Sequence, residues 1–183
     1  MSTAQHTIVA LVGDKPGVLN RMASLFRRRG FNIESIAVGH SEVPDLSRMT
    51  FVVNGSTMIV EQVRKQLSKV VDVVKVIDIT ADKTTVRELA LVKVRATADT
   101  RSEIIEIVDI FRANIVDVGA DSLIIEITGD EDKIGSLLNL LRGFGIREIS
   151  RTGRIAMLRG STGLLTEKER ARRTSKKRGE SKS

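Results

Sequence analysis

The order of strands and helices predicted from hydrophobic spacing occurs twice along this chain, and this repeat limits the fold more than any other feature. An apolar, β-rich run predicts a strand over residues 6–13, and helical spacing between Val18 and Phe26 predicts the helix that follows. Two strands, a second helix and a fourth strand then extend to Thr80. The first unit therefore has the order β-α-β-β-α-β.

Two local signals refine this first unit. Gly30 follows the last apolar residue of the first helix, a position typical of a left-handed helix cap. The alternation of apolar residues slips by one between Ile33 and Ile36, which predicts a β-bulge at Glu34 and Ser35.

The second unit repeats the order with little residue identity to the first. Thr100 and Glu103 have the spacing of a capping box, in which each side chain binds a free backbone N–H at a helix start. The predicted elements are strands over residues 88–97, 115–118, 123–128 and 146–157, and helices over 104–111 and 134–141.

The fold class is therefore α+β, with two tandem ferredoxin-like βαββαβ units. We place the units at residues 1–80 and 86–158, with a linker at 81–85 and a basic, disordered tail at 159–183. Each unit has four antiparallel strands with two helices on one face. Because the strands are apolar on both sides, the other face needs a cover, and we expect a second copy of the chain to supply it as a homodimer.

Charge is distributed unevenly along the chain. Residues 159–183 contain nine Lys or Arg and three Glu, so most of the net charge of +7 lies in the tail and the body is close to neutral. The chain has no Cys, no apolar run near the roughly 18 residues of a membrane span and no signal-peptide pattern. These features predict a cytoplasmic protein without a membrane partner.

A Pro-Gly turn between the first strand and the first helix is the strongest candidate site. The first N–H groups of a helix lack partners and carry partial positive charge, and Gly17 has no side chain to block a ligand. The backbone of Gly17, Val18 and Leu19 can therefore bind an anion such as a carboxylate. The alternative is an ordinary helix start that binds nothing.

The β-α-β-β-α-β order with D-x-P-G-V-L after its first strand resembles the ACT domain, a small-molecule regulatory module. The strings RRGFNIESI, DLSRMT and QLSKVVDVVKV are very similar to the regulatory (small) subunit of acetolactate synthase, also called acetohydroxyacid synthase. The similarity spans residues 6–160 and is strongest in the first unit. It includes the segment 87–93 and Phe111-Arg112 in the second unit.

The resemblance implies a subunit with no chemistry of its own. Members of this family bind the acetolactate synthase catalytic (large) subunit, raise its activity and confer feedback inhibition by a branched-chain amino acid, usually L-valine. They act in valine, leucine and isoleucine biosynthesis. Thiamine diphosphate, Mg and FAD are expected only in the catalytic partner, and no cofactor or metal in this chain.

The resemblance also implies an effector site between the ACT units of two chains. By position, Asp14, Gly17, Val18 and Leu19 come from one chain, and Asn32 and Ile33 come from the other. The turn would bind the carboxylate of the effector, the Asn32 side chain or a backbone carbonyl its ammonium, and Ile33 with nearby aliphatic residues its branched side chain. Family members usually have Glu-Asn where this chain has Gly13-Asp14, which leaves open whether Asp14 holds the ammonium or repels the carboxylate.

Three other classes of function were weighed. The basic tail is compatible with an RNA-binding module, but sheet-based RNA readers stack bases on exposed aromatic residues, and this chain has only five Phe and no Trp or Tyr. An ACT-type regulator of a different enzyme remains an alternative. A stand-alone enzyme is disfavoured because the sequence has no Ser-His-Asp set, phosphate loop or metal cluster, and we interpret His6 and His40 as ordinary strand or loop residues.

Overall fold

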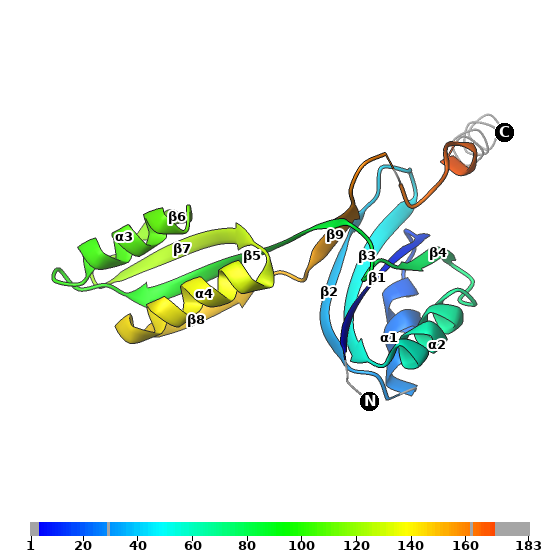
Figure 1. Cartoon of the computed structure of the whole chain (residues 1–183), viewed down its shortest axis with the longest axis horizontal. Helices are drawn as coiled ribbons and strands as arrows, with labels where there is room; N and C mark the ends of the chain where they lie inside the picture. The colour runs from blue at the N-terminus through cyan, green and yellow to red at the C-terminus, as the bar shows by residue number, and fades with distance from the viewer. Residues whose placement is uncertain (1–3, 29, 162, 171–183) are drawn as a thin grey trace. The chain divides into compact units, whose positions relative to one another are not determined.

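The computed structural model describes residues 4–28, 30–161 and 163–170. The chain divides into two compact units (Figure 1). The first unit runs to Thr85 and includes the chain again from Ala156, and the second unit is Val86–Ile155. Among the described residues, no helix is long and apolar enough to cross a membrane.

The first unit is a four-stranded antiparallel sheet with the strand order β2-β3-β1-β4. Its order along the chain is the predicted β-α-β-β-α-β. The elements are β1 (Ala4–Gly13), α1 (Val18–Arg28), β2 (Ile33–His40), β3 (Leu46–Gly55), α2 (Thr57–Leu67) and β4 (Val73–Asp78).

The two helices pack on one face of this sheet through aliphatic side chains and a pair of phenylalanines. Phe26 of α1 and Phe51 of β3 are buried with ring centroids 5.2 Å apart. Ile8, Val60 and Leu67 belong to the same core cluster. Leu19 is 46% exposed, so it does not share the buried stripe of α1 with Met22.

Both refinements of the first unit are confirmed. The register between β2 and β3 shifts between Ile33 and Ser35, which is where the slip in alternation predicts a bulge. Gly30 has φ of 69°, a left-handed conformation that glycine adopts at little cost and that ends α1.

The second unit contains a sheet with the order β6-β7-β5-β8, and β9 also pairs with β5. Its core joins Val92 and Ile125 of the sheet to Ile104 and Leu137 of the helices. The elements are β5 (Thr84–Arg95), α3 (Arg101–Ile110), β6 (Asn114–Val118), β7 (Ser122–Gly129), α4 (Glu131–Leu141), the 3-10 turn η1 (Arg142–Phe144) and β8 (Ile146–Arg151). Strand β9 (Ile155–Leu158) follows at the boundary where the chain returns to the first unit.

Two details of the second unit differ from the predictions. The capping box is wrong because the Thr100 hydroxyl accepts the backbone N–H of Thr97, at 3.0 Å, and makes no cap hydrogen bond to its own helix. The single strand predicted over 146–157 is two strands, β8 and β9. They are separated at Thr152, whose backbone N–H donates to the carbonyl oxygen of Leu89 over 2.9 Å.

The expectation of a disordered tail is corrected for residues 163–170. Leu164 and Leu165 are 6% and 4% exposed, and Glu167 to Arg170 form a helical turn. Two buried leucines supply the apolar contact that the charged composition of this segment conceals. The rest of the tail, residues 171–183, lies outside the described residues.

The expected cover for the second face of the first sheet is also corrected. Residues on that face are buried within a single chain, including Val9 at 0%, Leu11 at 1% and Val52 at 1% exposure. The burial of this face therefore requires no second copy of the chain.

Candidate effector site

The turn between β1 and α1 is anchored by backbone hydrogen bonds on both sides. The Gly13 N–H donates to the carbonyl oxygen of Asp72 and the Asp14 N–H to that of Asp45, each over 2.8 Å. Gly17 has φ of 81°, in the left-handed region that favours glycine. The turn is thus held in place by the turn before β4 and by the loop before β3.

The predicted anion-binding amides have different surroundings. Val18 is 2% exposed, so its side chain belongs to the core, and its N–H makes a long 3.4 Å contact with the carbonyl oxygen of Lys15. Among the described residues, the backbone N–H of Leu19 has no backbone acceptor, as expected in a first helical turn. Leu19 therefore offers both a free donor and a half-exposed aliphatic side chain.

Asp14 is held by two side chains from neighbouring strands. The Ser47 hydroxyl donates to Asp14 Oδ1 over 3.2 Å, and His40 Nδ1 lies 3.2 Å from Asp14 Oδ2. The Asp14 side chain remains 45% exposed. The Ser47 hydroxyl thus supplies a donor to one carboxylate oxygen, and the His40 imidazole lies beside the other.

Arg21 and Asp72 also border the turn, although the sequence did not identify them as site residues. The Arg21 guanidinium pairs with the Asp72 carboxylate. One of its terminal nitrogens lies 3.6 Å from the position that a Cβ on Gly17 would occupy. A ligand carboxylate at Gly17 would therefore meet this guanidinium. The spacing of Arg21, one helical turn after Gly17, is the only signal in the sequence that could have indicated it.

Asn32 and Ile33 lie at the opposite end of the same sheet. Ile33 pairs with Val53, which pairs with His6 near the start of β1, whereas the turn follows Gly13 at its end. Seven residues of antiparallel strand span about 24 Å. Asn32 is exposed and its amide donates to Glu34 Oε1 over 2.9 Å. The structure therefore does not bring the two predicted halves together within one chain.

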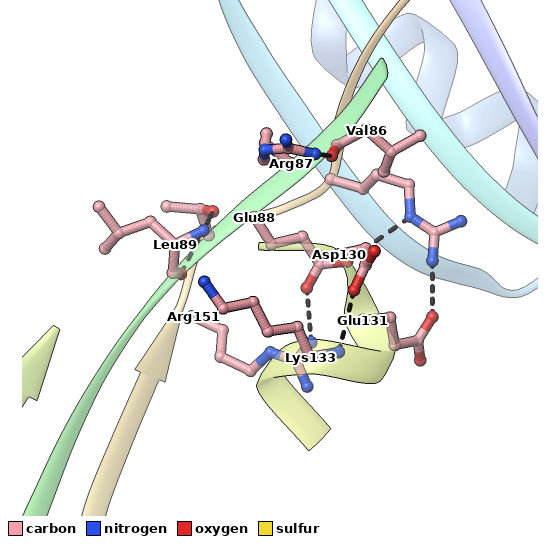
Figure 2. A network of polar contacts seen from close by, with 10 residues as sticks. Val86, Arg87, Glu88, Leu89, Asp130, Glu131, Lys133 and Arg151 are labelled. Carbon is pink, nitrogen blue, oxygen red and sulfur yellow. Dashed lines mark hydrogen bonds and ion pairs between the residues drawn. The ribbon is translucent and has the colours of Figure 1, made fainter. Parts of the chain in front are cut away.

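A second polar cluster, in the second unit, is built around Glu88 (Figure 2). The Glu88 side chain is 7% exposed and accepts from Arg151 over 2.5 Å, and Arg154 Nε lies 3.5 Å from its other oxygen. Arg154 also donates to Glu131 at the start of α4 over 2.6 Å. The carboxylates of Glu88 and Glu131 already have cationic partners. The cluster therefore links β5, the segment after β8 and the start of α4, and we assign it a structural role.

No group of residues in the described part of the chain could hold a metal ion. Asp130 caps α4, since its side chain accepts the Lys133 N–H over 2.9 Å. A carboxylate at this position stabilises the positively charged end of the helix.

Comparison with protein families gives two adjacent matches. Residues 8–75 match the AHAS small subunit-like ACT domain. Residues 87–160 match a family described as the small subunit of acetolactate synthase. Together the matched segments cover most of both units and end before the C-terminal segment.

Individual relatives agree with the family matches. The probable acetolactate synthase small subunit of Archaeoglobus fulgidus is 56% identical over 157 residues, which are 86% of this chain and 98% of the relative. The acetolactate synthase small subunit of Mycobacterium bovis is 50% identical over 168 residues, 92% of this chain and all of the relative. The crystal structure of the acetolactate synthase small subunit from Thermotoga maritima superposes with a TM-score of 0.80 at 44% identity, covering 87% of this chain and 99% of that one.

Proposed function

Because this chain belongs to the family of acetolactate synthase small subunits, we propose that it is the regulatory subunit that activates an acetolactate synthase catalytic subunit and makes it sensitive to L-valine. The partner supplies thiamine diphosphate, Mg and FAD and carries out the condensation of pyruvate. This chain contributes binding and regulation in the cytoplasm, within branched-chain amino acid biosynthesis.

The observation that carries the valine site is the separation of its two halves along the first sheet. Strand β2 is an edge strand, and Ile36 and Val38 on it are 36% and 49% exposed. If two copies pair antiparallel through β2, the start of one strand meets the end of the other. Asn32 of one copy then lies beside the partner's His40, which contacts the partner's Asp14. A homodimer through this edge thus completes the site twice.

The completed site matches the groups of an α-amino acid. The valine carboxylate accepts from the Leu19 N–H and lies near the Arg21 guanidinium. The ammonium donates to Asp14 and to the Asn32 side-chain oxygen. Leu19 and Ile33 offer aliphatic contact for the branched side chain. One methylene in such a pocket is worth about 1–3 kcal/mol, so leucine and isoleucine should bind within about two orders of magnitude of valine.

Regulation then follows from linkage between the two binding events. If valine binds more tightly to the arrangement in which the catalytic subunit is inactive, it shifts the complex toward that arrangement. The same coupling requires the catalytic subunit to change the affinity for valine, because linkage is reciprocal.

Calorimetry of the purified chain with L-valine, compared with L-leucine, L-isoleucine and D-valine, tests the site. We expect stereoselective binding of about one valine per chain, because each dimer has two equivalent sites. Reconstitution with the catalytic subunit then tests activation. Binding of valine without activation would favour the alternative, an ACT-type regulator of a different enzyme.

Replacing Asn32 by alanine is expected to weaken valine binding at least several-fold, because the ammonium loses a charge-assisted hydrogen bond worth about 1.5–3 kcal/mol. Titration calorimetry measures the change. Asn114→Ala is the matched control, since Asn114 is also an exposed asparagine that donates to a glutamate, over 3.2 Å, but lies in the second unit. Equal affinities for the parent and Asn32→Ala would remove Asn32 from the site.

A further inference from the structure

The second face of the first sheet is buried although both helices pack on the other face. We define this face by Thr7, Val9 and Leu11 of β1 with Thr50 and Val52 of β3. These residues alternate with the helix-facing core residues Ile8, Ala10 and Phe51. All five are at most 8% exposed. Some other part of the chain must therefore shield them from solvent.

Two hydrogen bonds place the C-terminal segment over the middle of this face. In the sheet register, Leu11 pairs with Arg48 on one side and with Lys75 on the other, so the three form a row across the sheet. Arg48 donates to the carbonyl oxygen of Ala156 over 2.6 Å, and Lys75 Nζ lies 3.5 Å from Glu169 Oε2. These two residues flank Leu11, so the two ends of the segment, Ala156 and Glu169, are bonded to residues on either side of it.

The segment has its own apolar contacts and its own local structure. Leu164 and Leu165 are buried, and they lie between the two anchor points along the chain. Thr166 and Glu169 form a reciprocal capping box: Glu169 Oε2 accepts from the Thr166 N–H over 2.7 Å, and the Thr166 hydroxyl accepts from the Glu169 N–H over 3.3 Å. Hydrogen bonds donated by the Thr166 backbone N–H and hydroxyl lower the pKa of the Glu169 carboxyl, which lies beside Lys75.

The end of the segment is fixed to the loop between β2 and β3. Arg170 lies 3.1 Å from Glu42 Oε1. Burial lowers the pKa of the neighbouring Arg48 guanidinium, and the Glu42 carboxylate opposes that shift. One carboxylate thus serves two arginines, one from the sheet and one from the segment. The segment is attached at its start through Ala156 and at its end through Glu169 and Arg170.

We propose that residues 156–170 are a cover supplied by the chain itself, which closes the second face and keeps that face from associating with a second copy of the chain. Removal of the cover would expose the apolar side chains of Val9, Leu11 and Val52 on a face with no helix of its own. Exposed apolar surfaces of this kind tend to associate, and two sheets can pack face to face. The partner available in a pure solution of this protein is the same face of another copy of the chain. Residues 161–170 lie beyond the family match, which ends at residue 160.

The test replaces the two leucines in the full-length chain. Leu164→Ser with Leu165→Ser should lower the melting temperature by roughly 10 °C, because two buried aliphatic side chains are lost. Binding of the dye ANS should rise several-fold, and sedimentation velocity at tens of micromolar should show a larger species than the parent. Leu165→Ala alone serves if the double variant does not fold.

The matched control is Glu167→Gln with Lys168→Gln, two exposed changes in the same segment that keep its net charge. It should behave like the parent in all three measurements. A leucine variant with the melting temperature and dye binding of the parent would contradict the proposal that the segment covers this face. A folded variant that binds dye but sediments like the parent would overturn its role in association. None of these three measurements uses valine or the catalytic subunit, so the result is independent of the proposed function.

Discussion

Replacing Glu88 by alanine is expected to lower the free energy of unfolding of the second unit by about 3–5 kcal/mol. The Glu88 carboxylate lies at a core position, two residues before the fully buried Ala90, and it is bonded to Arg151 and near Arg154. Arg154 is only 12% exposed. Without the carboxylate, a buried guanidinium keeps its charge and loses one of its anionic partners, which costs far more than the ion pair itself contributes.

Denaturant unfolding followed by circular dichroism measures this loss, combined with hydrogen exchange of the β5 amides, because the chain has no Trp or Tyr to report on each unit by fluorescence. Asp121→Ala is the matched control. Asp121 bonds to Arg147 over 2.6 Å in the same unit, but its side chain is 67% exposed, so water replaces the lost partner. Glu88→Ala and Asp121→Ala with equal stabilities would show that the Glu88 cluster is not structural.

The fold of each unit is predictable from the sequence because its signals are local. The slip in alternation near Glu34 is a property of neighbouring residues, and it predicts a bulge at its observed position. The same holds for Gly30 at the end of α1. Helical and strand periodicity can both be recognised in the sequence without any knowledge of long-range contacts.

The features that differ from prediction depend on residues far apart in the chain. The break after β8 reflects Arg151 and Arg154 meeting Glu88, more than sixty residues earlier. In the C-terminal segment Leu164 and Leu165 are buried, while the charges around them resemble a disordered tail. Contacts between residues so far apart in the chain cannot be predicted from the spacing of residues along the sequence.

The candidate site shows the same division. Gly17 was identified from its turn, and its left-handed φ agrees with that role. The side chains around it could not be found locally. Asp72 comes from the turn before β4, and His40 from the end of β2. His40, interpreted as an ordinary strand or loop residue, lies at the end of β2 with its Nδ1 3.2 Å from Asp14 Oδ2.

Replacing Gly17 by aspartate is expected to weaken valine binding at least 100-fold while activation of the catalytic subunit is retained. The new carboxylate would lie where the valine carboxylate binds, and two such charges 4 Å apart repel by about 4 kcal/mol at an effective dielectric of 20. It would also bind the Arg21 guanidinium, whose nitrogen is 3.6 Å from the new Cβ. The new side chain would thus both occupy the anion site and repel the carboxylate of valine.

Gly30→Asp separates this effect from backbone strain and added charge. Gly30 has φ of 69° and open space around it, so aspartate there carries the same conformational cost at the other end of α1. Calorimetry gives the affinity, and inhibition of the reconstituted enzyme by valine gives the regulatory effect. If Gly17→Asp binds valine as tightly as Gly30→Asp, the new charge on the turn has no specific effect on valine affinity. The carboxylate of the effector then does not lie on this turn. If both lose feedback equally, α1 rather than its first turn transmits the signal.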